Sequence, residues 1–508
     1  MKRLLAPLFV ALAVLVALLF GVAWLPLREA RDAWRAGRDA GAVATAERWS
    51  RLRLWPSSYD QLLAAAYLTV GNRAAAQGHL HGQPLRPVIA EDEVARRLFA
   101  RERYDDFLAY DAAFHDDGAA LYRTAALAAT HRTAEAAAAL RGVRGADPKK
   151  VALLQNVIAG NAVWFADRNG AGIDNADFAP LVRALPHGSS IVETTLDPLV
   201  QRAALQALGG YRGAIVAIDP RTNEVLAIAS SAKENLAIDG QYEPGSVIKV
   251  LTGLNALTNG VDVRSMFPYV CKGELMIDGR HFGDWVPSGH GTLNSIDDAL
   301  AVSCNVFFAD VGLRLGRDRL QQFMKSAGFD GQTNTGVMTV PLGKLLERPD
   351  NNFETAFLAI GLKHESINAF HLAVLASAMA NRGVLTAPRL LRARRSILGD
   401  VVALPPAQGH VQLGSPAAAE TMIHAMQAVV TEPRGTGRRA PVPGLTMAMK
   451  TGTAGERKAG LEALIMAFAP AEQPRIAFGI IAENAGPAEL AGAKIAHDFL
   501  AAVQTRLH

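Results

Sequence analysis

Three short motifs, separated by long stretches of chain, place the strongest constraint on how this 508-residue sequence can fold. They read Ser246-Val-Ile-Lys249, Ser303-Cys-Asn305 and Lys450-Thr-Gly-Thr453. The first offers a nucleophile with a base, the second a polar relay, and the third a cation beside hydroxyl groups, which suits a carboxylate. These are the parts of a serine acyl-transfer site, so the sequence predicts one domain in which three distant segments meet.

The first motif lies in a setting that favours catalysis. Glu243-Pro-Gly245 predicts a turn, and the apolar run after it predicts a helix with Ser246 in its first turn. Lys249 lies on the same face and is the single charged residue between Ser246 and Asn259. Burial disfavours a charged amine, so the lysine pKa should fall toward that of a working base. The alternative is that Ser246 only caps the helix and Lys249 extends to solvent.

The second and third motifs are informative mainly through their order and neighbours. Ser303 and Asn305 can relay a proton and hydrogen-bond a peptide. The segment Lys450-Thr-Gly-Thr453 ends a predicted strand in which Thr451 and Thr453 share one face, and Gly452 lets a substrate backbone approach closely. The chain also holds Ser230-Ser-Ala-Lys233 and Ser366-Ile-Asn368, which carry the same letters in other settings. A single copy of either motif is therefore compatible with ordinary turn chemistry.

The composition changes along the chain and predicts separate domains. Residues 28–165 are rich in Ala and Arg and have helical periodicity. Within them, residues 44–80 and, more weakly, 119–141 are similar to a tetratricopeptide repeat, although an ordinary small helical bundle explains the same pattern. Residues 166–189 predict a linker rich in Asn, Asp and Gly.

Residues 190–508 have the alternating pattern of an α+β domain. Strands are predicted at both ends of this region, with a long, mainly helical stretch between them and a closing helix over 488–505. The predicted strands are 213–218, 225–229, 445–453, 463–468 and 475–483. One sheet assembled from both ends of the region would bring the third motif close to the first.

The N-terminus carries an uncharged apolar run from Leu4 to Leu27, which is long enough to span a bilayer. We expect residues 1–27 to be a cytoplasmic stub with a single transmembrane anchor. A cleaved signal peptide is the alternative, because Gly21-Val-Ala23 resembles a cleavage site. Basic residues flank the run on both sides, so the positive-inside rule does not decide the orientation.

Charge and cysteine content exclude several other classes. The net charge is +4 and the arginines are scattered, which gives no support to nucleic-acid binding. Cys271 and Cys304 could pair outside the cytoplasm, but two cysteines do not make a disulfide framework. Because zinc-ligand spacings and His-rich clusters are absent from the sequence, we expect no metal and no cofactor.

Around the three motifs the sequence resembles the transpeptidase domain of penicillin-binding proteins. The resemblance covers about residues 190–505. Beyond the motifs it rests on five further segments: Thr194-Thr-Leu-Asp-Pro198, the predicted hairpin 213–229, His290-Gly291, Gly435-Thr-Gly437 and Phe468-Ala-Pro470. No glycosyltransferase signature precedes it, so the resemblance is to the monofunctional, class B type, here with an atypical helical N-terminal domain.

The resemblance implies a fold and a set of roles. The fold is that of penicillin-binding proteins and serine β-lactamases: an antiparallel five-stranded sheet flanked by helices, plus an all-helical subdomain. Ser246 would attack the D-Ala-D-Ala carbonyl of a peptidoglycan stem peptide, with Lys249 as the base. Ser303 and Lys450 would pass the proton to the leaving D-Ala, and Asn305 would orient the substrate amide.

The remaining implied roles concern recognition of the substrate. Thr451, Gly452 and Thr453 would bind the terminal carboxylate, and the N–H groups of Ser246 and Thr453 would form the oxyanion hole. β-Lactams would acylate Ser246. The catalytic domain would lie outside the cytoplasm, on a bacterial inner membrane, and the helical domain 28–165 would bind a protein partner.

The sequence departs from the family pattern at three places. Met449 stands where the family usually has glycine, Gly361-Leu-Lys-His364 replaces a Gly-Gln-Gly-like turn, and the strand after the third motif lacks the family's Trp. Three alternatives to a D,D-transpeptidase remain open at this point. They are a D,D-carboxypeptidase or endopeptidase with water as acceptor, a catalytically silent cell-wall scaffold, and a β-lactamase or β-lactam sensor.

Overall fold

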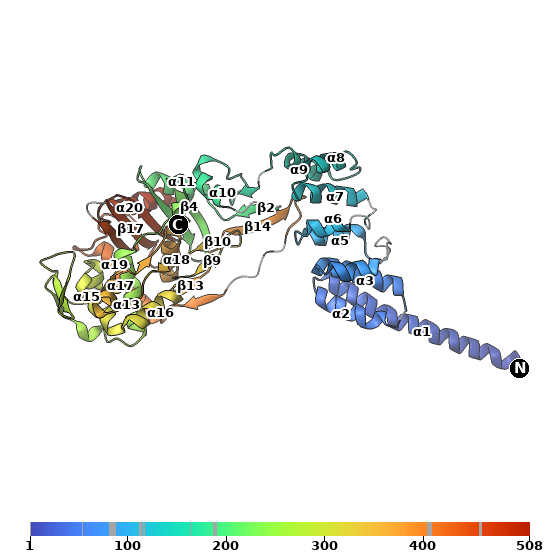
Figure 1. The fold of residues 1–508 in the computed structure, drawn as a ribbon, viewed down its shortest axis with the longest axis horizontal. Helices are drawn as coiled ribbons and strands as arrows, with labels where there is room; N and C mark the ends of the chain where they lie inside the picture. The colour runs from blue at the N-terminus through green and yellow to red at the C-terminus, as the bar shows by residue number, and fades with distance from the viewer. Residues whose placement is uncertain are drawn as a thin grey trace. The chain divides into compact units, whose positions relative to one another are not determined.

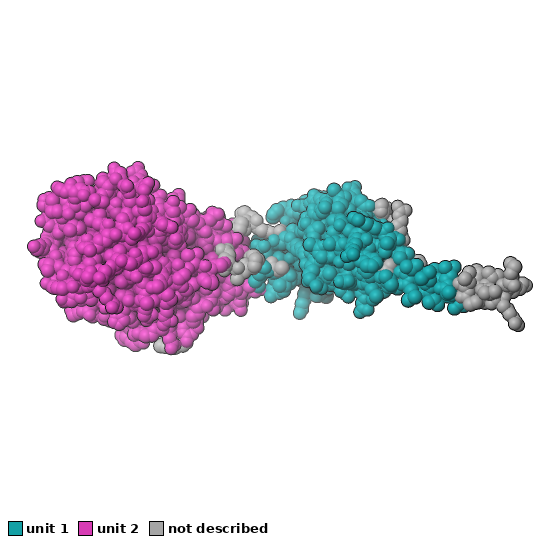
Figure 2. Space-filling model, turned by 90° about the horizontal axis from the view of Figure 1, so that it is seen from below, with its two compact units in different colours: residues 1–164, 187–192, 393–404 teal, residues 165–186, 193–392, 405–508 magenta. Residues whose placement is uncertain are grey.

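The computed structural model describes residues 2–52, 54–80, 88–110, 114, 117–162, 164–185, 190–402, 404, 409–456 and 460–507. The chain folds into two compact units (Figures 1 and 2). Unit 1 contains residues 1–164, 187–192 and 393–404, and unit 2 contains residues 165–186, 193–392 and 405–508. Each unit is described separately below.

Unit 1 is built from helices that follow one another as hairpins (Figure 1). They are α1 (Lys2–Arg35), α2 (Asp39–Ser50), α3 (Pro56–Val70), α4 (Arg73–Leu80), α5 (Glu91–Phe99), α6 (Tyr104–Ala109), α7 (Asp117–Ala129), α8 (Thr133–Leu140) and α9 (Pro148–Ile158). The predicted turn at Gly71-Asn72 joins α3 to α4, and the weaker predicted copy corresponds to α7 and α8.

The same tight turn recurs between the paired helices of unit 1. Gly37, Gly71, Glu102 and His131 each have a positive φ, between 56° and 86°. At each turn the next residue donates its N–H to a carbonyl five residues back, as from Asn72 to Tyr67 at 3.0 Å and from Arg132 to Leu127 at 2.8 Å. The turns recur roughly every 30 residues, close to the period of a tetratricopeptide repeat. Repetition of one local geometry explains why the helices stack in regular pairs.

Helix α1 has two different parts. It is the one described helix that is long and apolar enough to span a membrane, over Val10–Arg35. Most described side chains from residue 10 to 25 are exposed, whereas Leu27, Ala30 and Trp34 are buried in the core of unit 1. The Trp34 indole donates a hydrogen bond to Thr69 in α3 at 3.1 Å. The apolar segment therefore continues without a break into the first helix of the helical unit.

A short excursion of the chain at 393–404 belongs to unit 1. Ile397 and Leu398 are buried in the helical core, although they lie in sequence within the region that resembles a transpeptidase. Ion pairs from Arg394 to Glu102 at 2.9 Å and from Lys150 to Asp400 at 3.0 Å hold the excursion. The predicted linker at 166–189 contains 3-10 helix η2 (Ala176–Phe178) and helix α10 (Ala179–Ala184), and its residues 186–189 lie outside the described ones.

The sheet of unit 2 is the predicted five-stranded antiparallel sheet, with strand order β16-β17-β18-β3-β4. Its strands are β3 (Gly213–Asp219), β4 (Glu224–Ser230), β16 (Ala448–Glu456), β17 (Gly460–Ala469) and β18 (Ile476–Ala482). Every residue of β18 is buried, because helices cover both faces of the sheet. Pairing of β18 with β3 joins strands from the two ends of the region, which confirms the sequence-based topology.

Helices of unit 2 fall into two groups. α11 (Pro198–Ala207), α18 (Ala369–Ala380) and α20 (Ala491–Val503) pack on the sheet. Six more form a helical subdomain beside it: α13 (Lys249–Thr258), α14 (Ile296–Ala301), α15 (Asn305–Leu315), α16 (Arg317–Ser326), α17 (Asn352–Ile360) and α19 (Pro416–Thr431). Of these, α19 also packs on the edge strand β16. The short helix α12 (Leu236–Asp239) and two 3-10 turns, η3 (Gly245–Ile248) and η4 (Arg264–Met266), connect these parts.

Short strands complete the architecture. They are β1 (Phe165–Ala166), β2 (Ser190–Thr194), β5 (Tyr269–Cys271), β6 (Glu274–Ile277), β7 (Arg280–Gly283), β8 (Gly291–Leu293), β9 (Gln332–Asn334), β10 (Thr339–Pro341), β11 (Lys344–Leu345), β12 (Glu365–Ser366), β13 (Val384–Thr386), β14 (Leu391–Ser396) and β15 (His410–Gln412). A final 3-10 turn, η5 (Gln504–Arg506), follows α20. The pairs β5–β8 and β6–β7 carry the loop that leads into the second motif.

Candidate active site

Ser246 lies in the 3-10 turn η3, which leads directly into α13. Gly245 before it has a φ of 55° and donates its N–H to the carbonyl of Gly361 at 2.8 Å. A Cβ at position 245 would come within 2.7 Å of the Thr453 carbonyl oxygen. Only glycine therefore fits between β16 and the turn that presents the nucleophile.

Lys249 is completely buried at the start of α13. Its Nζ donates to the Ser303 carbonyl and to Asn305 Oδ1, both at 2.6 Å, and lies 3.2 Å from Ser303 Oγ. Burial lowers the lysine pKa to about 8, although the negative charge of Asp284 opposes part of this effect. A neutral amine has two hydrogens and one lone pair. The two carbonyl-type oxygens can only accept, so they fix both hydrogens and leave the lone pair free to take a proton.

Ser303 Oγ lies between the two buried lysines. Lys450 Nζ donates to Ser303 Oγ at 2.9 Å and to the Thr451 carbonyl at 2.8 Å. Burial, and then repulsion from Lys249, lowers the pKa of Lys450 well below its usual value. Two ammonium groups are therefore disfavoured around one hydroxyl, and a proton can pass between the lysines through Ser303. Ser303 itself has a φ of 57°, a strained value that the surrounding contacts hold in place.

Strand β16 carries the third motif and packs against the turn that presents Ser246. The Thr451 hydroxyl is hydrogen-bonded to that of Thr436 at 2.7 Å, and the Ala488 N–H donates to Thr453 Oγ1 at 3.0 Å. A Cβ at Gly452 would lie 2.6 Å from the Pro244 carbonyl oxygen, so this glycine is needed for close packing on the nucleophile turn. The two threonine hydroxyls on one face are thereby held in fixed positions.

These residues surround a cavity of about 350 Å³. Polar residues of all three motifs line it: Ser246, Ser303, Asn305, Thr451 and Thr453. Its lining also includes the apolar residues Trp285, Ile360, Leu362, Leu461 and Pro487, together with Glu489. A cavity of this size, with convergent polar groups and titratable residues of shifted pKa, is the expected form of a catalytic site.

The structure thus brings together all the predicted site residues. Lys249, Ser303, Asn305 and Lys450 are linked by hydrogen bonds, and Ser246, Thr451 and Thr453 line the same cavity. The two look-alike motifs lie elsewhere and have structural contacts. Ser230 Oγ donates to the Glu234 carbonyl at 2.7 Å, and Asn368 caps α18 by accepting from the His371 N–H at 2.8 Å.

Three residues of the site were not predicted from the sequence: Asp284, Thr436 and Glu489. Asp284 accepts from the N–H groups of Asn305 at 2.8 Å and Val306 at 3.2 Å, which fixes the start of α15. Burial alone raises the pKa of this carboxyl, but the hydrogen bond from His290 and the charge of Lys249 outweigh it and hold the pKa below its usual value. Thr436 could have been identified from Gly435-Thr-Gly437, whereas Asp284 and Glu489 stand in segments with no recognisable motif.

One cluster beside the site has the donor atoms of a metal site. Cys271, Asp284 and Cys304 place two sulfurs and a carboxylate oxygen within 4.8 Å of one another. His290 lies next to them, with Nε2 at 3.1 Å from Asp284 Oδ1. Two thiolates with a carboxylate and an imidazole would suit a soft divalent cation. No motif spacing in the sequence indicates this cluster, because Cys271, Asp284, His290 and Cys304 come from four separate segments.

The comparisons with known proteins agree with this geometry. A family model described as Penicillin binding protein transpeptidase domain matches residues 213–503, more than half of the chain. The chain belongs to this family. Its site thus has the family's three motifs arranged around one cavity.

Individual relatives support the assignment to penicillin-binding proteins. The chain is 31% identical over 342 residues to the peptidoglycan D,D-transpeptidase MrdA of Acinetobacter baumannii. The matched region covers 57% of this chain and 50% of that protein. It is 28% identical over 346 residues to the D,D-transpeptidase PbpA of Mycolicibacterium smegmatis, with coverage of 59% and 68%. The crystal structure of Pseudomonas aeruginosa PBP2 matches with a TM-score of 0.55 and 26% identity, over 62% of this chain and 76% of that one. The chain spans about half the length of the Acinetobacter relative.

Two departures from the usual penicillin-binding protein sequence have local explanations. The Met449 side chain is completely buried, and a Cβ at Gly437 would lie 2.7 Å from its sulfur, so the methionine fills space that Gly437 leaves open. Gly361 keeps the essential part of the family turn, because a Cβ there would lie 2.0 Å from the Gly245 carbonyl oxygen. Lys363 supports the same turn through its N–H, which donates to Glu243 Oε1 at 2.8 Å.

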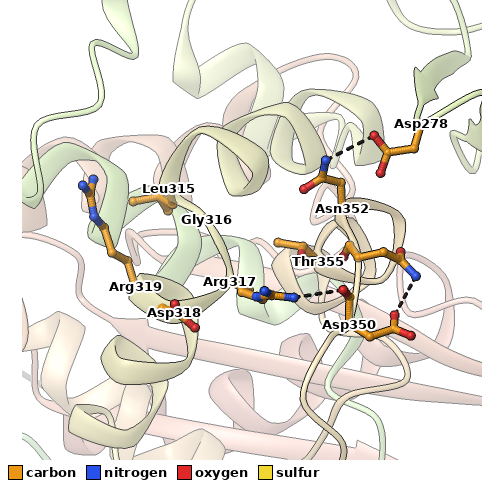
Figure 3. A pocket seen from close by; sticks show the side chains of 10 residues that line it. Asp278, Leu315, Gly316, Arg317, Asp318, Arg319, Asp350, Asn352 and Thr355 are labelled. Atoms are coloured by element: carbon orange, nitrogen blue, oxygen red, sulfur yellow. Dashed lines mark hydrogen bonds between the residues drawn. The ribbon is translucent and has the colours of Figure 1, made fainter.

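A second cavity of unit 2, of about 510 Å³, lies near the starts of α16 and α17 (Figure 3). Arg317 donates to the Asp350 carbonyl at 2.9 Å, and Asn352 Nδ2 donates to Asp278 Oδ1 at 3.2 Å. Its lining includes three aspartates and two arginines (Asp278, Asp318, Asp350, Arg317 and Arg319), and none of the motif residues lines it. The larger cavity is therefore separate from the chemistry of the three motifs.

Proposed function

We propose that this protein is a peptidoglycan D,D-transpeptidase that forms an acyl-enzyme on Ser246 and transfers the acyl group to an amine. The observation that carries this proposal is the position of Ser303 Oγ, at 3.2 Å from Lys249 Nζ and 2.9 Å from Lys450 Nζ. This arrangement supports Lys249 as the base for the nucleophile and a proton path through Ser303 to the leaving group. The two relatives named as D,D-transpeptidases support the choice of substrate.

In the acylation step, neutral Lys249 takes the proton of Ser246 Oγ while the oxygen attacks the carbonyl carbon of the penultimate D-Ala. N–H groups of Ser246 and Thr453 would stabilise the oxyanion. The C–N bond then breaks, and Lys450 delivers a proton through Ser303 to the amine of the leaving D-Ala. Asn305 Oδ1 is engaged by Lys249, so its Nδ2 hydrogens are available to a substrate carbonyl.

Substrate carboxylate recognition is assigned to Lys450 and the hydroxyls of Thr451 and Thr453. The acyl-enzyme then reacts with the amine of a second stem peptide, which forms the cross-link and frees Ser246. β-Lactams would acylate the same serine, because their ring carbonyl and carboxylate imitate the two ends of the substrate.

Peptidoglycan lies outside the cytoplasm, so the catalytic unit must be there to act on it. The apolar part of α1 supports a single membrane anchor with the catalytic unit on the outer, periplasmic side. Cysteine accessibility on intact cells tests this orientation. A cysteine introduced at exposed Arg434 should react with a membrane-impermeant maleimide, and protection of this site until lysis would contradict it.

We also infer that the helical unit, predicted over 28–165, binds a protein partner, since stacked helical hairpins present extended binding surfaces. Leu52, Trp55 and Val70 are large apolar side chains exposed on this unit. A photo-crosslinking amino acid at position 52 should give a discrete adduct in cells, and the same group at Leu199 in unit 2 serves as the control. Equal patterns at both positions would count against a specific partner.

Labelling by a fluorescent penicillin tests the central proposal. Wild-type protein should become labelled, and Ser246→Ala should not. A mutant that labels as strongly as wild type would show that the nucleophile is another residue. Absence of labelling in both proteins would favour a catalytically silent cell-wall scaffold. Incubation with lipid-linked disaccharide pentapeptide and a glycosyltransferase, followed by muropeptide analysis, separates cross-linking from trimming. Tetrapeptides without cross-links would indicate a D,D-carboxypeptidase.

A further inference from the structure

Glu489 is the one carboxylate among the described residues that line the catalytic cavity. It stands in the loop between β18 and α20, next to Ala488, whose N–H donates to Thr453 Oγ1 at 3.0 Å. That contact holds the loop against the carboxylate-binding strand. Glu489 is half-buried, and its charge acts on Lys450. None of the steps proposed above uses it.

Structural roles do not account for this carboxylate. Glu489 forms no ion pair and no side-chain hydrogen bond with any of the described residues. It also does not cap α20, whose N-cap residue is Leu490 without a side-chain cap. The other carboxylate near the site, Asp284, has partners on both oxygens, whereas Glu489 lines the cavity and has no side-chain partner among the described residues.

A free anion in this cavity suits a cation on a substrate. The donor peptide offers a carboxylate at its end, which Lys450 and the threonines bind. The acceptor, by contrast, brings an amine, which is an ammonium ion at neutral pH. The leaving D-Ala vacates the space beside Thr451 and Thr453. Glu489 follows Ala488, which contacts Thr453, and it lines the same cavity, so an acceptor that enters this space comes close to Glu489.

We propose that Glu489 is the acceptor-binding residue, which holds the ammonium group of the incoming amine beside the acyl-enzyme. This proposal rests on the transpeptidase function proposed above. After acylation Lys249 passes its proton through Ser303 to Lys450 and is neutral again. In the transfer step Lys249 first takes one ammonium proton, which it later releases to solvent, and this frees the lone pair of the amine. The nitrogen then attacks the acyl carbon, the bond from that carbon to Ser246 Oγ breaks, a second proton goes to Ser246 Oγ, and the third remains on the new amide.

The partition of the acyl-enzyme between transfer and hydrolysis tests this role. The full chain, purified in detergent, is acylated with an acyl-D-alanyl thioester and offered either D-alanine, an ammonium acceptor, or hydroxylamine, an uncharged one. Products are quantified by mass spectrometry. Glu489→Gln should lower the transfer-to-hydrolysis ratio with D-alanine about tenfold, the effect of one screened charge pair. The ratio with hydroxylamine and the rate of acylation by penicillin should stay within about twofold of wild type.

Two further variants separate the charge from its surroundings. Glu489→Asp keeps the anion and should retain most of the D-alanine transfer, whereas Glu472→Gln, in the turn at the far end of β17 and β18, should behave as wild type. An unchanged D-alanine ratio in Glu489→Gln overturns the proposal, and so does a parallel fall in penicillin acylation. Wild type that hydrolyses the thioester but transfers to neither acceptor refutes the transpeptidase function and the acceptor role together. If wild type transfers the acyl group to D-alanine and Glu489→Gln transfers it equally well, only the role of Glu489 is refuted.

Discussion

The buried amine of Lys249 should give β-lactam acylation a characteristic pH dependence. Only the neutral amine can accept the Ser246 proton, and burial places its pKa at about 8. The neutral fraction is then about one-hundredth at pH 6, one-tenth at pH 7 and nine-tenths at pH 9. The acylation rate should rise about tenfold per pH unit up to pH 7.5 and level off near pH 9.

Stopped-flow acylation by a fluorescent penicillin, at subsaturating concentration and from pH 6 to pH 10, measures this profile. A lysine with its ordinary pKa of 10.5 would instead give a rate that still rises about eightfold between pH 9 and pH 10. Such a profile, or one independent of pH, would refute the base assignment. Lys249→Arg is the matched control, because it keeps a cation that does not deprotonate in this range. Its acylation should stay low at every pH.

Three other changes probe the site and the core. Ser303→Ala should reduce acylation by roughly 100-fold with little change in melting temperature, because it removes the hydroxyl between the lysines but keeps the backbone. Gly245→Ala should nearly abolish labelling by fluorescent penicillin, since its Cβ would meet the Thr453 carbonyl oxygen at 2.7 Å; full labelling would contradict the packing argument. Leu398→Ala should cost unit 1 about 2–5 kcal/mol of stability. Limited proteolysis should then cut within α3–α9 sooner than in wild type, and an unchanged pattern would show that the excursion is dispensable.

The sheet could be predicted from the sequence because its strands have strong local signals. The hairpin β3–β4 and the strands β16, β17 and β18 are continuous apolar runs bounded by turn residues, and antiparallel pairing follows from the short connections. The nucleophile turn could also be predicted from the sequence, since a single lysine in an apolar helix has few structural explanations. These features depend on neighbouring residues in the sequence.

Features that depend on distant contacts could not be predicted. The excursion 393–404 is a short segment of mixed polar and apolar residues, and nothing local indicates that Ile397 and Leu398 enter a helical core. The cluster of Cys271, Asp284 and Cys304 likewise forms only when the β5–β8 ladder meets the start of α15. In the helical unit, the turns at Glu102 and His131 were hidden because these residues adopt a positive φ that the sequence would assign to glycine.

The same buried lysine should make the fold less stable at neutral pH than at high pH. The folded pKa of Lys249, about 8, lies below the ordinary value of 10.5 that the unfolded chain has. Between these values the unfolded state binds more protons, so stability rises with pH in this window, and the full penalty is present below pH 8. This difference between the folded and unfolded pKa of Lys249 corresponds to about 3 kcal/mol in the free energy of unfolding.

Lys249→Met isolates this contribution, because methionine fills similar space without a charge. Between pH 7 and pH 10.5 the free energy of unfolding of wild type should rise by about 3 kcal/mol relative to that of Lys249→Met, as measured by urea unfolding of both proteins. Absolute stabilities are less informative, since the variant leaves the Ser303 carbonyl and Asn305 Oδ1 without their donor at every pH. That loss cancels when the pH dependences are compared. Parallel curves for the two proteins would mean that Lys249 is as protonated in the folded protein as in the unfolded one, and the lone pair required for catalysis would then be missing.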